Sequence, residues 1–224
     1  MDLVKYYNHV MNNFTDPKTR GWLINKPSLL VPVIAVYWIF CTQIGPQYMK
    51  NRPAYKLTRI IQVYNISQVI INTVLAVVGF FSVLHYNWIC QPVDYSMDPR
   101  EVRVSLIGWA YCVTKLVDLL DTVFFVLRKK FNQVSPLHLY HHIIMGGPFI
   151  YATNFYATGH PVFPFGLNAI VHILMYFYYF LASLGPKYHK YLWWKRHLTE
   201  FQIVQFMMRR LDQNIINIYG GNGT

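Results

Sequence analysis

Long apolar runs separated by short basic segments dominate the chain. Five such runs cover residues 28–49, 66–84, 104–127, 137–156 and 161–184. About 20 apolar residues in a helix cross the roughly 30 Å hydrocarbon core of a bilayer. The runs are continuous rather than alternating, which favours helices over the strands of a membrane barrel. The pattern therefore predicts an all-α, polytopic membrane helical bundle, whose first helix is kinked or shortened by Pro32 and Pro46.

A sixth apolar segment begins at Leu198 but meets a cluster of charges that starts at Arg209. About eleven residues before these charges are too few for a comfortable crossing. We therefore expect an incomplete sixth helix, followed by an atypical C-terminal end over residues 209–224. Because no internal repeat or linker interrupts the pattern, we predict a single membrane domain over residues 1–224.

The composition agrees with a membrane protein. Hydrophobic residues make up 54% of the 224 residues and charged residues only 13%, about half the share that is usual in soluble domains. The net charge of +11 would suggest a nucleic-acid partner in a soluble protein. Here the basic residues sit in short loops between apolar runs, as membrane orientation requires. We therefore expect the bilayer, and no nucleic acid, as the partner.

The distribution of Lys and Arg predicts the orientation. The loops after the first, third and fifth runs hold eleven of them, whereas the N-terminal segment and the loop after the second run hold six. The positive-inside rule places the eleven in the cytosol, and residues 1–27 on the lumenal side. A glycosylation sequon at Asn13-Phe14-Thr15 fits this orientation. Residues 1–27 lack the apolar core of a signal peptide, so the first run is expected to direct insertion.

Polar side chains collect in the cytosolic half of the predicted bundle, where they are costly and usually functional. The third run contributes Lys115, Asp118, Asp121 and Thr122, the fourth His138, His141 and His142, the fifth Asn168, His172, Tyr176 and Tyr179, and the sixth segment Gln202 and Gln205. Helical spacing brings the members of each set to one face or its flank.

Each set also has a structural interpretation. Lys115 and Asp118 would form an ion pair that locks the helix. Tyr178 or Tyr179 would anchor the bundle at the membrane interface, and the glutamines would bond neighbouring helices. His172 would be a satisfied core residue. Three imidazoles spaced as HxxHH are much harder to explain by packing alone.

Two chemistries suit the histidines. A metal-dependent membrane oxidase would use imidazole ligands, which Asp118 and Asp121 could supplement. Such enzymes carry several histidine boxes, whereas only four of the nine histidines here belong to the cluster. Acyl transfer is the other chemistry, because imidazole can attack a thioester or act as a general base. Both hypotheses remain open on the residues alone.

Four ordered motifs, KLVDLLDT, HLYHH, HILMYFYY and LTEFQIVQ, together with IGPQYMKNRP and the pair Tyr64-Asn65, resemble the ELO family of very-long-chain fatty acid elongases. The resemblance covers roughly residues 20–208. It implies condensation of malonyl-CoA with a long-chain acyl-CoA to give 3-oxoacyl-CoA, CoA and CO2. It further implies a multi-pass protein of the endoplasmic reticulum membrane, an elongase-like core over residues 28–208, and no cofactor or metal beyond the two substrates.

The resemblance also assigns roles. The implied catalytic residues are His138, His141, His142 and His172; the supporting residues are Lys115, Asp118, Asp121, Asn168, Tyr176, Tyr179, Gln202 and Gln205; and the residues for the CoA phosphates are Lys129, Lys130, Lys187, Lys190, Lys195 and Arg196.

The chain departs from the family pattern in two ways. Asp118 stands where the family usually has Glu, and the seventh helix of the family is absent. We therefore expect a C-terminally truncated form, whose activity is a separate hypothesis. The alternative is an inactive elongase that acts only as an interaction partner. Homo-oligomers, or hetero-oligomers with other elongation enzymes, fit either case.

Overall fold

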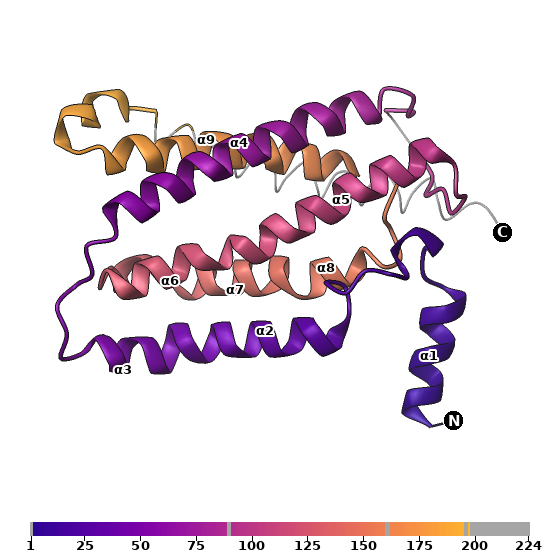
Figure 1. The fold of residues 1–224 in the computed structure, drawn as a ribbon, viewed down its shortest axis with the longest axis horizontal. Coiled ribbons are helices and arrows are strands. Elements are labelled where there is room, and N and C mark those ends of the chain that lie inside the picture. The colour runs from indigo at the N-terminus through magenta and orange to yellow at the C-terminus, as the bar shows by residue number, and fades with distance from the viewer. Residues whose placement is uncertain (1, 89–90, 160–161, 195–196, 198–224) are drawn as a thin grey trace. The chain divides into compact units, whose positions relative to one another are not determined.

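The computed structural model describes residues 2–88, 91–159, 162–194 and 197, and this part of the chain contains helices and no strands (Figure 1). The described residues of 1–57 and 93–158 form one compact unit, and those of 58–92 and 159–224 form a second. We call them unit 1 and unit 2. Each unit is assembled from two separate stretches, so no single linker divides the chain. The predicted sixth segment lies outside the described residues.

Three helical segments in the described residues are long and apolar enough to cross a membrane. They are Pro27–Met49, Thr58–Ser82 and Val162–Ser183. The prediction of an all-α, polytopic membrane protein is thereby confirmed. The second of these, α4 (Thr58–Ser82), begins eight residues before the apolar run that predicted it. An apolar run marks the part that suits lipid, and polar residues such as Asn65 can continue the same helix beyond it.

The first span changes its winding along its length. α2 (Pro27–Ile39) passes into η2 (Phe40–Ile44), a π-helical turn, and then into α3 (Gly45–Met49). Proline has no N–H to donate to the preceding turn, so the helix widens just before Pro46. The expected disturbance of the first helix is therefore found at Pro46, whereas Pro32 lies inside α2.

The run over residues 104–127 forms two successive helices rather than one. α5 (Pro99–Val117) begins after Asp98, whose side chain accepts the Arg100 N–H. α6 (Leu119–Leu127) follows directly after Asp118. The junction is a tightened turn, because the Asp121 N–H bonds to the Asp118 carbonyl at 3.1 Å, an i to i+3 contact.

The run over residues 137–156 is also broken. α7 (Pro136–Gly146) and α8 (Pro148–Ala152) meet at Gly147, whose φ of −123° and ψ of −90° leave the helical region. Proline disfavours helical geometry in the residue before it and supplies no N–H itself. The sequence Gly147-Pro148 therefore ends α7. In unit 1, α7 packs against both α2 and α5 (Figure 1).

The N-terminal segment contains structure that the sequence pattern did not predict. α1 (Leu3–Asn13) is a helix of eleven residues, and η1 (Pro17–Thr19) follows it. In unit 2, α9 (Val162–Ser183) pairs with α4, and η4 (Pro186–Tyr191) follows it. The remaining short element is η3 (Phe131–Gln133) in unit 1.

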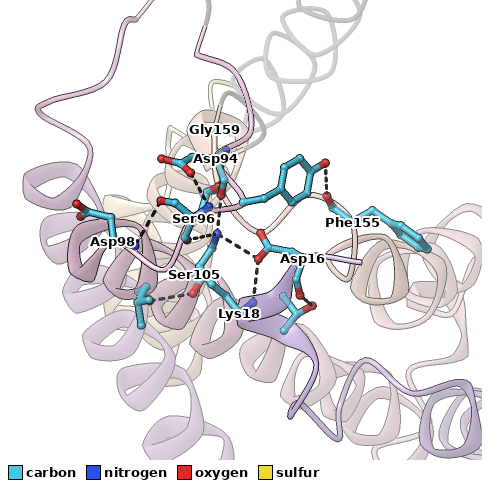
Figure 2. Close-up of polar contacts among 12 residues, drawn as sticks. Asp16, Lys18, Asp94, Ser96, Asp98, Ser105, Phe155 and Gly159 are labelled. Carbon is cyan, nitrogen blue, oxygen red and sulfur yellow. Dashed lines mark hydrogen bonds and ion pairs between the residues drawn. The ribbon is translucent and has the colours of Figure 1, made fainter. Parts of the chain in front are cut away.

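Buried polar contacts attach the N-terminal segment to the rest of unit 1 (Figure 2). The Lys18 ammonium lies 3.1 Å from Asp16 Oδ1, and both side chains are almost fully buried. The same ammonium donates to the carbonyl oxygens of Asp94 and Ser96. The Asp16 N–H donates to the Asn154 carbonyl at 2.7 Å. We call these contacts the N-terminal clasp.

Glycosylation at Asn13 tests the predicted orientation. Asn13 is exposed at the end of α1. When the chain is expressed in membranes with glycosylation activity, we expect a glycosidase-sensitive increase in mass, which the substitution Asn13→Gln removes. Gel mobility with and without glycosidase measures it. A wild-type chain without the glycan, alongside a glycosylated control protein, would contradict a lumenal N-terminal segment.

Candidate functional site

The three histidines of the HxxHH motif occupy the first turns of α7. Ser135 caps this helix, since its side chain accepts the His138 N–H at 3.2 Å, and Pro136 takes the first helical position. The ring centroids of His138 and His142 are 4.3 Å apart, and those of His141 and His142 are 5.7 Å apart. The predicted grouping of three imidazoles is therefore found within one helix.

A chain of hydroxyl contacts fixes His138. The Thr122 hydroxyl lies 2.9 Å from His138 Nε2, and the Tyr37 hydroxyl lies 2.7 Å from the same Thr122 oxygen. Tyr37 and Thr122 are buried, and the contacts link α2, α6 and α7. Tyr37 was not among the predicted site residues. A lone tyrosine in an apolar run gives no sequence signal that separates it from a packing residue.

Lys115 and Asp118 form a buried ion pair. Lys115 Nζ lies 2.8 Å from Asp118 Oδ2, and the two side chains are 2% and 4% exposed. The same ammonium sits 4.8 Å above the ring of Tyr111. The carboxylate of Asp118, one methylene shorter than that of a glutamate, therefore reaches Lys115. Asp121 is buried nearby on α6.

The polar stripe predicted on the fifth span lies on α9 in unit 2. Asn168, His172 and Tyr176 are buried. The ring centroids of His172 and Tyr176 are 5.7 Å apart, and those of Tyr176 and Tyr179 are 6.2 Å apart. The Tyr64 hydroxyl of α4 approaches the Tyr176 hydroxyl at 3.3 Å. The i, i+4, i+7 spacing thus produces one continuous polar stripe.

The basic residues expected to hold CoA phosphates lie at the surface where they are described. Lys130, Lys187 and Lys190 are exposed. Lys129 is half-buried, and its ammonium donates to the Lys50 carbonyl at 3.4 Å. The predicted residues Lys195, Arg196, Gln202 and Gln205 lie outside the described part of the chain.

The described residues contain no group of three or more His, Cys, Asp or Glu side chains that is arranged to hold a metal ion. The chemical groups that they do bring together are imidazoles and hydroxyls in unit 1, and an imidazole with hydroxyls and amides in unit 2. Such groups can attack an acyl carbon, move protons and donate hydrogen bonds to a carbonyl oxygen.

Comparison with known proteins agrees with these motifs. Residues 22–215 match the family model described as "ELO: GNS1/SUR4 family". Very long chain fatty acid elongase 7 of Rattus norvegicus is 38% identical over 208 residues, which cover 92% of this chain and 74% of the rat protein. Very long chain fatty acid elongase 7 of Drosophila melanogaster is 39% identical over 207 residues, covering 90% and 62% of the two chains.

A human relative gives the same result at lower identity. Very long chain fatty acid elongase 1 of Homo sapiens is 35% identical over 211 residues, with 92% of this chain and 75% of the human protein covered. The chain thus spans between about three fifths and three quarters of the length of these relatives. With its helical fold, its HxxHH helix and a family match over most of its length, this chain belongs to the ELO (GNS1/SUR4) family.

Proposed function

We propose that this chain elongates long-chain fatty acyl groups, by condensing malonyl-CoA with a long-chain acyl-CoA. The products are a 3-oxoacyl-CoA two carbons longer, CoA and CO2. The observation that carries the proposal is the cluster of three imidazoles on α7, fixed through His138 to buried hydroxyls, in a member of the ELO family. Three rings held at this spacing suit a nucleophile with its proton-transfer partners.

The reaction requires a nucleophile, a proton carrier and oxyanion donors. A neutral imidazole nitrogen of His141 or His172 attacks the acyl carbon of the thioester, and the carbon–sulfur bond breaks to release CoA. Malonyl-CoA then loses CO2, and the electron pair left behind forms an enolate at its C2. The enolate attacks the acyl carbon, and the bond to the imidazole nitrogen breaks, which regenerates the histidine.

The other polar residues take supporting roles in this scheme. His138 and His142 orient the reacting ring or move protons, and the Thr122 hydroxyl holds His138 in one orientation. Within unit 2, Asn168 and Tyr176 are candidate donors to the oxyanion of an acyl group held at His172. Exposed lysines, Lys130 and Lys187 among them, are candidates for the CoA phosphates. The proposed location is the endoplasmic reticulum membrane, with the CoA groups entering from the cytosol.

A turnover assay tests the proposal. Membranes that contain the chain are incubated with a long-chain acyl-CoA and labelled malonyl-CoA, and the expected product is labelled 3-oxoacyl-CoA. Membranes without the chain control for endogenous elongases. If a related elongase yields product under these conditions and this chain yields none, the proposal is wrong for this chain.

Removing the Thr122 hydroxyl tests the contact that fixes His138. Because valine keeps the shape of threonine, we expect Thr122→Val to leave the chain folded and to lower kcat about 10- to 100-fold, as a misplaced catalytic group does. KM should change little, since the hydroxyl lies beside the imidazole rather than at the CoA-binding surface. Tyr37→Phe, which removes the more distant hydroxyl, should have a smaller effect. Equal activity in wild type and Thr122→Val would contradict this role.

A further inference from the structure

α4 carries a row of amide side chains that the proposed chemistry has not used. Asn65, Gln68 and Asn72 are spaced i, i+3 and i+7, and only 2%, 2% and 0% of their surfaces are exposed. Other residues of the same helix, including Ile70 and Val74, are exposed. The amides therefore occupy the inner face of a span whose other face suits lipid.

Contacts between α4 and α9 give the level of each amide. The two helices run antiparallel, since Gln62 Nε2 donates to the Ser183 carbonyl at 3.1 Å, while Tyr86 near the other end of the pair bonds to the Gly159 N–H. The hydroxyl contact between Tyr64 and Tyr176 gives the register.

One helical turn from the Tyr64–Tyr176 contact, Gln68 of α4 is at the level of His172 of α9. After a second turn, Asn72 is at the level of Asn168. Asn65 and Asn72 thus lie on either side of the level of His172, about 10 Å apart along the helix.

Two of these amides have atoms that lack a hydrogen-bond partner. Among the described residues, nothing bonds to Asn65 Nδ2 or to Asn72 Oδ1. Asn72 Nδ2 is satisfied, because it donates to the Gln68 carbonyl at 2.9 Å. A buried polar atom without a partner is destabilising, and hydrocarbon offers no water in exchange. One unused donor and one unused acceptor therefore remain on the buried face of α4.

We infer that Asn65 and Asn72 bind the arm of the CoA thioester that carries amide groups, at the level where its acyl group reacts. Asn65 Nδ2 donates to a carbonyl oxygen of the arm, and Asn72 Oδ1 accepts an amide N–H. This arm, between the CoA phosphates and the sulfur, offers both kinds of group along a thin chain, whereas a fatty acyl tail offers neither. The identity of the ligand rests on the proposed function, and the two unpartnered atoms do not.

The substitutions Asn65→Leu and Asn72→Leu test this inference, because leucine has the same branched shape and number of side-chain heavy atoms as asparagine and carries no polar atom. Replacing an unsatisfied buried polar group by an apolar one is neutral or stabilising. We expect the thermal unfolding midpoint of each full-length variant, without ligand, to equal or exceed that of the wild type. Thr73→Val is the matched control, since Thr73 is exposed on the same helix and bonds only within it.

Binding is measured with a saturated long-chain acyl-CoA thioether, which has the arm but cannot react. Loss of one hydrogen bond should weaken its binding about 3- to 10-fold in each leucine variant. Binding of the free fatty acid, which lacks the arm, should not change. Thr73→Val should bind both ligands as the wild type does.

The inference is wrong if the leucine variants unfold at lower temperature yet bind the thioether as tightly as the wild type. It is also wrong if thioether and free fatty acid lose affinity equally. Because the thioether is not turned over, the result is separate from the assay of the proposed function. A chain that binds the thioether through these amides but forms no 3-oxoacyl-CoA would support the inference and contradict the proposed function.

Discussion

Replacing His141 or His172 with alanine is expected to reduce condensation by at least about 100-fold. Each imidazole is a candidate for the group that carries the acyl chain, and loss of a proton-transfer imidazole alone costs about 10²- to 10⁴-fold. The rate of 3-oxoacyl-CoA formation measures the effect. Mass spectrometry of protein incubated with acyl-CoA alone should find the acyl group on only one of the two histidines, which identifies the nucleophile.

His9→Ala controls for the loss of a histidine as such. His9 lies on α1 and is exposed, so condensation should proceed at the wild-type rate. One of the two variants, His141→Ala or His172→Ala, retains the nucleophilic histidine. That variant should still accumulate acyl-enzyme, although slowly. Wild-type rates in both variants would exclude imidazole nucleophilic catalysis by either residue.

The substitution Lys18→Met is expected to lower the free energy of unfolding by about 3–5 kcal/mol, because it leaves the Asp16 carboxylate buried without its cation. The Asp16 and Lys18 side chains are 0% and 1% exposed. Methionine keeps the length of the lysine stem, so packing changes little. Thermal unfolding of the purified protein in detergent measures the loss.

Two further variants separate the effect of burying the Lys18–Asp16 ion pair from the effect of losing a charge. Arg100→Met removes an exposed ion pair, in which Arg100 lies 3.5 Å from Asp98, and should cost less than about 1 kcal/mol. Combining Lys18→Met with Asp16→Asn should restore part of the stability, since no buried charge is then left unpaired. Equal unfolding temperatures for Lys18→Met and Arg100→Met would show that the N-terminal clasp contributes no more than a surface ion pair.

The length of the apolar runs was sufficient to predict the helical, polytopic fold. It did not predict the breaks within the helices, because hydropathy carries no information about backbone geometry. The break at Gly147 follows from the proline after it, a signal that was present in the sequence. The tightened turn at Asp118 has no comparable signal. Helix α1 was not predicted because residues 1–27 contain no long apolar run.

The site could be predicted in part. Spacing alone grouped His138 with His142, and His172 with Tyr176, since both pairs are one helical turn apart. Tyr37 could not be found in this way, because its partner Thr122 is 85 positions away. The amides of α4 have a detectable signal in their i, i+3, i+7 spacing, although only Asn65 belongs to one of the motifs that resemble the ELO family.

The N-terminal clasp sets an order of events during synthesis. Its partners are far apart in the chain, since Lys18 bonds to residue 94 and Thr19 to residue 154. Those partners have not been synthesised when the first span is inserted. The segment that precedes this span therefore cannot complete the N-terminal clasp until residue 154 has been translated. Thr15 is buried once the fold is complete. Any sugar transfer to the neighbouring Asn13 is therefore expected to precede the formation of the N-terminal clasp.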